Sequence, residues 1–159
     1  MGYQPPTYAE PAAQVNYASF WIRLAAAFID GFIVSVALIV VFIVIGLIAG
    51  AAAAATGSSV ATTTTTPTEV LADVIYLLLY AGYFVYFWGM GQTPAMRWFG
   101  IYVADITTGG PIGFGRALTR FLGYMLSYLA CYIGLIWALF DPRRQGWHDK
   151  LANTVVIRL

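Results

Sequence analysis

The sequence predicts an all-α membrane protein: a small bundle of two to three transmembrane helices, with one apolar segment that either crosses or is re-entrant, and with short cytoplasmic strands. Composition is the first observation behind this class, because 60% of the 159 residues are apolar and only 9% are charged, against roughly 25% charged in an ordinary soluble domain. Three apolar runs are also long enough to cross a bilayer, which takes about 20 residues. Two short stretches rich in β-branched residues, of which the first alternates, predict strands.

The chain divides into two parts. Residues 1–16 are rich in Pro, Ala and Tyr and hold a single charge, so we expect a flexible tail there. Residues 17–159 form the transmembrane domain, whose first span is expected over about 22–52 because no charge occurs between Asp30 and Glu69. A helix through this whole run would exceed the bilayer's hydrocarbon core of about 30 Å, so part of it must tilt, bend or lie outside.

The start of this first helix is amphipathic. Ser19, Arg23 and Asp30 share one helical stripe, and Trp21 and Phe28 lie on the other side. Such a helix start either lies in the membrane interface or turns its polar stripe toward other helices.

The expected loops and spans then follow in order. Residues 56–69 form a Ser/Thr loop without a basic residue, expected to be a solvated connector or an exported loop that carries O-glycans. The second span is expected at about 70–90 and the third at about 119–140. Because cytoplasmic flanks of spans accumulate Lys and Arg, we place the N-terminus in the cytoplasm and the Ser/Thr loop outside.

The third apolar run creates a conflict with this rule. A full crossing by 119–140 would carry the basic residues that follow it to the outside. A break near 130–134 would return the chain and keep the expected strands, 101–106 and 154–159, on one side, where they can pair. Both interpretations stay open, and we favour the re-entrant one.

Asp30 is the carboxylate that most needs a partner. It follows Trp21 by nine residues, so with Trp21 at the interface it lies about 13 Å deep, where an unpaired charge costs at least about 3 kcal/mol. Arg23 lies too far along the helix axis for direct contact. Asp30 is therefore expected to be paired, hydrated or protonated. If it is ionised, Arg120 is the first candidate partner, and Arg116, one turn earlier, is a further possible one. The pair is either a static pin for helix packing or a site where Asp30 alternates between protonated and cation-bound or Arg-paired states.

Four motifs occur in this order along the chain: FWIRLAAAFIDGFI, GQTPAMRWFGIYVAD, GRALTRFL and FDPRRQGWHDKLANTVVI. Together they resemble the RDD family of bacterial integral membrane proteins, named for one arginine and two aspartates. The resemblance implies that Arg23 is the family arginine at the start of the first helix, that Asp30 is the aspartate within that helix, and that Asp149 is the second aspartate, with Asp141 as the close alternative. It also implies a membrane location, and transport, including cation/proton exchange, has been suggested for some members.

Several functions are disfavoured by the residues present. His148 is the only histidine and Cys131 the only cysteine, so we expect no metal site, and we expect His148 to be solvated or hydrogen-bonded at a surface rather than to relay protons. The chain contains no G-x-S-x-G and no P-loop. We therefore expect no enzyme and no cofactor, and the net charge of +1 gives no reason for a nucleic-acid partner.

Two functions stay open. The first is a small transporter or cation/proton exchanger that uses the intramembrane carboxylate of Asp30. The second is a non-catalytic accessory or assembly subunit of a larger membrane complex. In both cases we expect a multi-pass protein of the bacterial plasma membrane whose partners are the lipid bilayer and either further copies of this chain or a larger complex.

Overall fold

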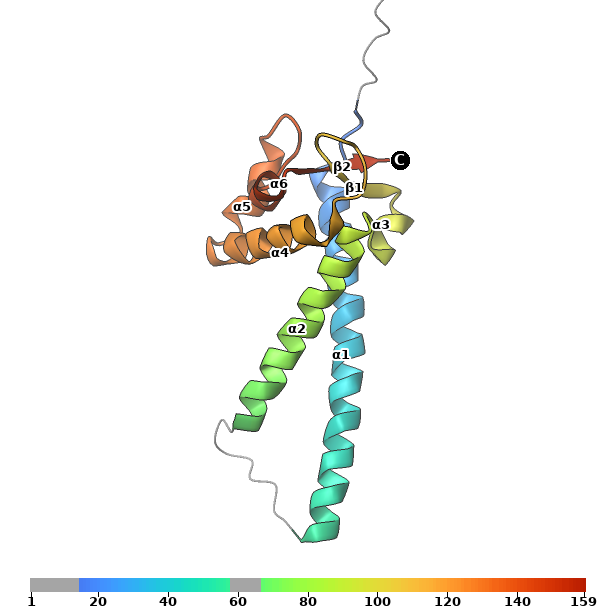
Figure 1. Ribbon diagram of the computed structural model, residues 1–159, viewed down its shortest axis with the longest axis vertical. Helices are drawn as coiled ribbons and strands as arrows, with labels where there is room; N and C mark the ends of the chain where they lie inside the picture. Colours follow the sequence, from blue (N-terminus) through green and yellow to red (C-terminus); the bar gives the residue numbers. More distant parts are fainter. Residues whose placement is uncertain (1–14, 58–66) are drawn as a thin grey trace, which may run out of the picture.

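Two long helices dominate the structure, a computed structural model that describes residues 15–57 and 67–159. Helix α1 (Phe20–Thr56) runs away from the compact end of the molecule and α2 (Pro67–Gly89) runs back toward it (Figure 1). Both are long and apolar enough to cross a membrane. The predictions for the tail and for most of the Ser/Thr loop concern residues 1–14 and 58–66, which lie outside the described residues.

The ends of α1 are set by local chemistry. The Ser19 side chain accepts the backbone N–H of Ile22 and so caps the N-terminus. At the other end Gly57 adopts a left-handed conformation (φ 67°) and donates its N–H to the carbonyls of Ala53 and Ala54, a common way to terminate a helix. The helix is therefore longer at both ends than the predicted 22–52.

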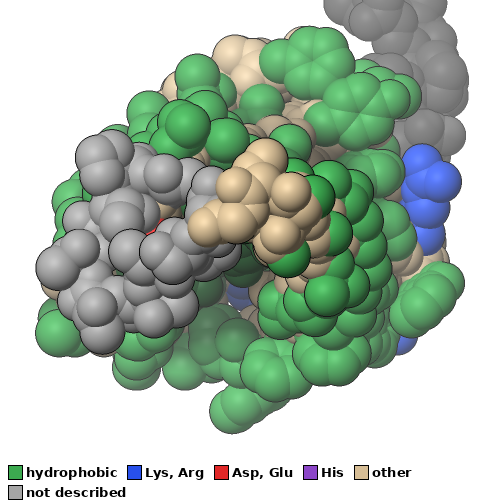
Figure 2. All heavy atoms as spheres, turned by 90° about the horizontal axis from the view of Figure 1, so that it is seen from below, with side chains coloured by type: hydrophobic (Ala, Val, Ile, Leu, Met, Phe, Trp, Pro, Cys, Tyr) green, Lys and Arg blue, Asp and Glu red, His purple; other side chains and the backbone are tan. Residues whose placement is uncertain are grey.

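The two long helices separate with distance from the compact end (Figure 1). The buried residues of α1 are Ala26, Asp30, Val34 and Leu38, which are spaced by four and lie within its first half. The amphipathic start is confirmed, because Trp21 and Phe28 are 69% and 76% exposed and Asp30 is fully buried. Seen along the hairpin, hydrophobic side chains cover most of the described surface (Figure 2).

A small sheet closes the compact end. Strands β1 (Ile101–Asp105) and β2 (Thr154–Arg158) pair antiparallel, with Val103 opposite Val156, which confirms the predicted strands and their common side. The segment before α1 lies beside β2, because the backbone N–H of Ala18 donates to the backbone carbonyl of Val156. Helix α3 (Pro94–Trp98) connects α2 to β1.

The third apolar run is a bent pair of helices. Helix α4 (Gly113–Leu129) lies across the top of the hairpin (Figure 1), and after a bend of 115° the chain continues as α5 (Ile133–Ile136) and the 3-10 helix η1 (Trp137–Leu139). The break occurs at Cys131 and Tyr132, both with positive φ, a conformation that interrupts a right-handed helix. The break is thus where the re-entrant interpretation expected it, and the segment begins earlier than the predicted residue 119.

The bend brings α6 (Trp147–Ala152) back onto α4. Gly123 makes this contact possible, because a Cβ there would lie 2.7 Å from the Cα of His148. The hydrophobic core lies where the end of α2, α4 and the sheet meet, and it contains Trp88, Phe121 and Val103. Every element needed for the polar clusters described next is therefore at the compact end.

Candidate functional site: two buried polar clusters

The first cluster surrounds Asp30, whose side chain is fully buried. One carboxylate oxygen accepts the hydroxyl of Tyr83 at 3.0 Å and the backbone N–H of Ala95 at 3.0 Å. The other accepts the hydroxyl of Thr93. Since Thr93 also caps α3 by accepting the N–H of Met96, Asp30 joins the first helix to the end of α2 and the turn that follows it.

The predicted pairing of Asp30 with Arg120 is wrong. Asp30 makes no contact with Lys or Arg among the hydrogen bonds and ion pairs of the described residues. The reason is the direction of α4, which lies across the hairpin and turns Arg120 toward α6 instead. Three neutral donors take the place of the expected cation, which is the usual way a buried carboxylate is satisfied without a counter-charge.

The second cluster surrounds Asp149, which is also fully buried. Its two carboxylate oxygens form ion pairs with Arg23 and Arg120, one each. Arg120 also donates to the hydroxyl of Thr154 at 2.8 Å, and Asp149 accepts the backbone N–H of Gly146 at 3.0 Å. This bond caps the N-terminus of α6. Asp149 therefore stabilises its own helix and, through the two ion pairs, links α6 to α1 and α4.

The electrostatics of this cluster favour an ionised Asp149. Burial alone would raise the pKa of Asp149, but the adjacent Arg120 and Arg23 outweigh burial and hold this pKa well below its usual range. With one carboxylate and two guanidinium groups, the cluster carries a net charge of one positive unit. Of the two aspartates considered for the second family position, the structure thus brings Asp149 to the arginine.

His148 lies inside this cluster, so its predicted surface position is wrong, and of the two expected states it is hydrogen-bonded rather than solvated. Its side chain is 3% exposed, its Nε2 lies 3.3 Å from the Asp149 carboxylate and 3.4 Å from Arg23, and its ring lies 4.0 Å from that of Tyr124. Burial lowers the pKa of His148 to about 4, although the carboxylate acts in the opposite direction. The imidazole is therefore neutral at neutral pH.

The remaining predicted residues lie outside both clusters. Arg116 pairs with Asp105, whose pKa is lowered first by the backbone N–H of Thr107 and further by Arg116. Asp141 pairs with Lys150 and accepts the backbone N–H of Arg143 at 2.9 Å. These two carboxylates stabilise turns near the surface.

Sequence reasoning missed three hydroxyl groups in the clusters, those of Tyr83, Thr93 and Thr154. Tyr83 belongs to an aromatic stripe that is typical of packing, and Thr93 precedes Pro94, a pattern that indicates a helix start but not a carboxylate contact. Thr154 opens a strand and gives no signal of its own. Within residues 15–57 and 67–159 no group of three His, Cys, Asp or Glu side chains is placed to hold a metal ion.

Fold and site together define a small helical membrane protein whose two long spans are anchored at one end by buried carboxylates. The chain belongs to the RDD family, which matches residues 17–153.

Comparison with curated proteins agrees with this assignment. The chain is 31% identical to the uncharacterized protein YxaI of Bacillus subtilis over 147 residues, 88% of this chain and 96% of that protein. It is 34% identical to an uncharacterized protein of Haemophilus influenzae over 55% of this chain and 58% of that protein, and 38% identical to the proline-rich antigen homolog of Mycobacterium tuberculosis over 35% of this chain. The chain spans about a quarter of the length of that antigen homolog. No solved structure matches.

Proposed function

We propose that the chain is a non-catalytic membrane subunit that docks through its two spans onto other membrane helices of a larger complex. The observation that carries this proposal is how little of the spans the chain itself covers. In the most apolar 18-residue stretch of each span, only 11% of the residues of the first span and 6% of those of the second are buried. Helices in a bilayer associate through close packing with other helices, and these two leave most of their surface for partners or lipid.

The far half of α1 has a surface suited to a partner helix. Gly46 and Gly50 are four residues apart, and a Cβ at either would meet no atom within 4 Å. Small residues at this spacing let two transmembrane helices approach closely. The partner helix is expected to contact this glycine pair.

The setting of Asp30 supports the same proposal over the cation/proton exchanger. An exchanger needs its carboxylate to meet water or an ion in at least one state. Asp30 is fully buried and is held by three donors. Arg23 and Arg120 are both held by the carboxylate of Asp149, so we interpret these buried charged residues as groups that fix the packing of the fold.

The distribution of charge supports a topology with the compact end in the cytoplasm. All eight Lys and Arg residues belong to the start of α1 or to the segment from α3 to β2, at one end of the hairpin, as the positive-inside rule requires. Single cysteines at Thr108 and Leu159, in a Cys131→Ser background, are expected to react with an impermeant maleimide only from the cytoplasmic side. Reaction from the outside at Leu159 alone would contradict the re-entrant fold.

Co-purification tests the docking proposal. The tagged full chain is extracted from its native membrane in mild detergent as wild type, as Gly46→Leu/Gly50→Leu, and as the control Ala52→Leu, which places a leucine on the opposite, exposed face of α1. We expect a defined membrane partner with the wild type and the control, and a loss of about tenfold with the glycine variant. The proposal would be contradicted if the wild-type chain purifies alone, or if the glycine variant retains as much partner as the wild type.

A further inference from the structure

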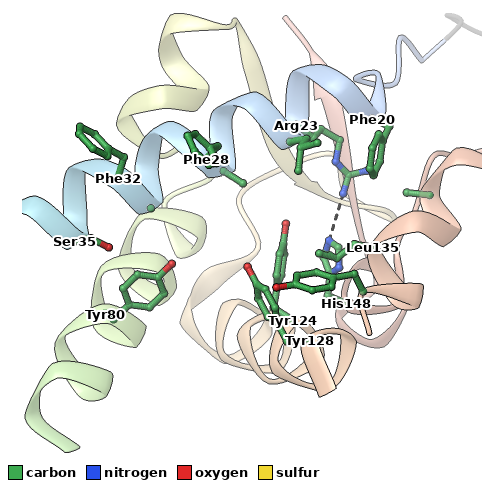
Figure 3. A pocket seen from close by; sticks show the side chains of 15 residues that line it. Phe20, Arg23, Phe28, Phe32, Ser35, Tyr80, Tyr124, Tyr128, Leu135 and His148 are labelled. Atoms are coloured by element: carbon green, nitrogen blue, oxygen red, sulfur yellow. Dashed lines mark hydrogen bonds between the residues drawn. The ribbon is translucent and has the colours of Figure 1, made fainter. Parts of the chain in front are cut away.

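A cavity of about 540 Å³ lies between α1 and the bent α4–α5 segment (Figure 3). Arg23 and His148 lie at one end of it, and the hydroxyl of Ser35 lies at the other. Its volume is in the range of sites that hold small organic ligands. The cavity does not include Asp30, so it is separate from the first polar cluster.

The polar end of the cavity favours an anion. Arg23 and Arg120 are balanced by one carboxylate, that of Asp149, and His148 adds no charge at neutral pH because its pKa is lowered to about 4. None of the residues that line the cavity is acidic. The Arg23 guanidinium also donates a hydrogen bond to the backbone carbonyl of Arg144. The side chain of Arg144 is an exposed cation in the adjoining loop. A molecule in the cavity would therefore meet a net positive charge at the Arg23 end.

The rest of the cavity favours a long apolar chain. From Arg23 to Ser35 the cavity follows α1 for twelve residues, which is about 18 Å. Phe28 and Phe32 form its outer edge and are 76% and 65% exposed, on a helix that is long and apolar enough to span the bilayer. The cavity therefore opens toward lipid rather than only toward water.

Between these two ends lie tyrosines whose hydroxyls are unused. Tyr80, Tyr124 and Tyr128 line the cavity, and none of the three hydroxyls has a hydrogen-bond partner among the described residues. Tyrosine combines an apolar ring with a polar tip and is enriched where lipid head groups meet acyl chains. Hydroxyls at this level can donate to phosphate or ester oxygens.

We propose that this cavity binds one anionic phospholipid from the surrounding bilayer, with its phosphate beside Arg23 and an acyl chain along α1 toward Ser35. A free inorganic anion would satisfy the charge but would leave the apolar length of the cavity unfilled. The site does not depend on the docking proposal, because docking concerns the far half of α1 and the cavity lies along the first half.

Native mass spectrometry of the full chain released from nanodiscs tests this site. The nanodiscs contain equal amounts of phosphatidylglycerol and phosphatidylcholine with the same acyl chains. We expect the protein to retain phosphatidylglycerol over phosphatidylcholine by about tenfold. Gly31→Leu fills the middle of the cavity, where a Cβ would meet only the Tyr80 hydroxyl at 3.6 Å, and is expected to abolish this preference. Gly82→Leu is the control, because it adds the same side chain to α2 at a position with no neighbour within 4 Å and outside the cavity.

Three outcomes would overturn the proposal. Equal retention of the two lipids would show that the charge at Arg23 selects nothing, and unchanged retention by Gly31→Leu would place any bound lipid elsewhere. Displacement of phosphatidylglycerol by excess inorganic phosphate would show that the occupant is a soluble anion. If Gly31→Leu lowers the yield of folded protein, Ala27→Leu, which lines the same cavity, replaces it and is expected to give the same loss.

Discussion

The carboxylate of Asp30 accepts the backbone N–H of Ala95 at 3.0 Å, across 65 positions of the chain. This bond joins the first span to α3, the short helix after the second span, and so helps to set how the two spans meet at the compact end. Asp149 does the equivalent for the last third of the chain by binding Arg23 on α1 and Arg120 on α4. Two carboxylates thus attach α1 to α2, α3, α4 and α6.

At Asp30 we expect hydrogen-bond acceptance to matter more than charge. Asp30→Asn keeps an oxygen that can accept from Tyr83 and Ala95, so it is expected to cost less than about 1.5 kcal/mol. Asp30→Ala leaves the Ala95 N–H, Thr93 and Tyr83 without an acceptor and is expected to cost at least about 3 kcal/mol. Thermal unfolding of both variants in detergent checks this order. Equal losses would mean that the negative charge itself is required.

At Asp149 we expect charge to dominate. Asp149→Asn leaves Arg23 and Arg120 buried without a counter-charge, and breaking a buried pair in this way costs about 3–5 kcal/mol. Asp141→Asn is the matched control, because its partner Lys150 is 44% exposed and exposed pairs contribute at most about 1 kcal/mol. Unfolding midpoints measured in one detergent compare the two. Similar midpoints would contradict the anchoring role of Asp149.

The buried His148 predicts that stability falls in mild acid. Its pKa is lowered from 6.5 in the unfolded chain to about 4 in the folded state, so between these values the unfolded chain binds the extra proton. Stability is therefore full above about pH 6.5 and decreases as the pH falls toward 4, by about 3 kcal/mol in total. Arg23 from α1, Arg120 and Tyr124 from α4, and Asp149 face the imidazole.

His148→Gln isolates this effect, because glutamine does not titrate. We expect the pH dependence of the unfolding midpoint between pH 6.5 and 4 to flatten in this variant. The carboxylate of Asp149 contributes little in this window, because its stabilisation is lost mainly below its ordinary pKa of 3.8, as the pH falls toward its lowered folded pKa. An unchanged pH profile in His148→Gln would show that another group titrates.

The contact between α4 and α6 predicts a large difference between two glycines of one helix. Gly123→Ala would place a methyl group 2.7 Å from the His148 Cα, so α6 must shift, at a cost of about 1–3 kcal/mol. Gly115→Ala meets no atom within 4 Å and is expected to stabilise α4 by about 0.5–1 kcal/mol. Comparison of unfolding midpoints checks both signs. A neutral Gly123→Ala would show that α6 does not pack closely on α4.

The sequence predicted the elements better than their partners. Alternation located the first strand and β-branched residues the second, and the excess of basic residues after the third apolar run indicated the return that the break at Cys131 and Tyr132 produces. The partner of Asp30 was not predictable, because it depends on the direction in which α4 crosses the hairpin. The burial of His148 likewise depends on the close approach at Gly123, a tertiary contact that leaves no local pattern.

Ion-dependent proton flux in everted vesicles tests most directly the central claim, that the buried charged residues anchor the fold and do not move ions. Vesicles with wild type and with Asp30→Asn are compared at matched amounts of protein in the membrane, with empty vesicles as reference. The sealed setting of Asp30 predicts that neither protein gives flux above the reference. A wild-type flux that Asp30→Asn abolishes would contradict the account and identify Asp30 as the carboxylate of an exchanger.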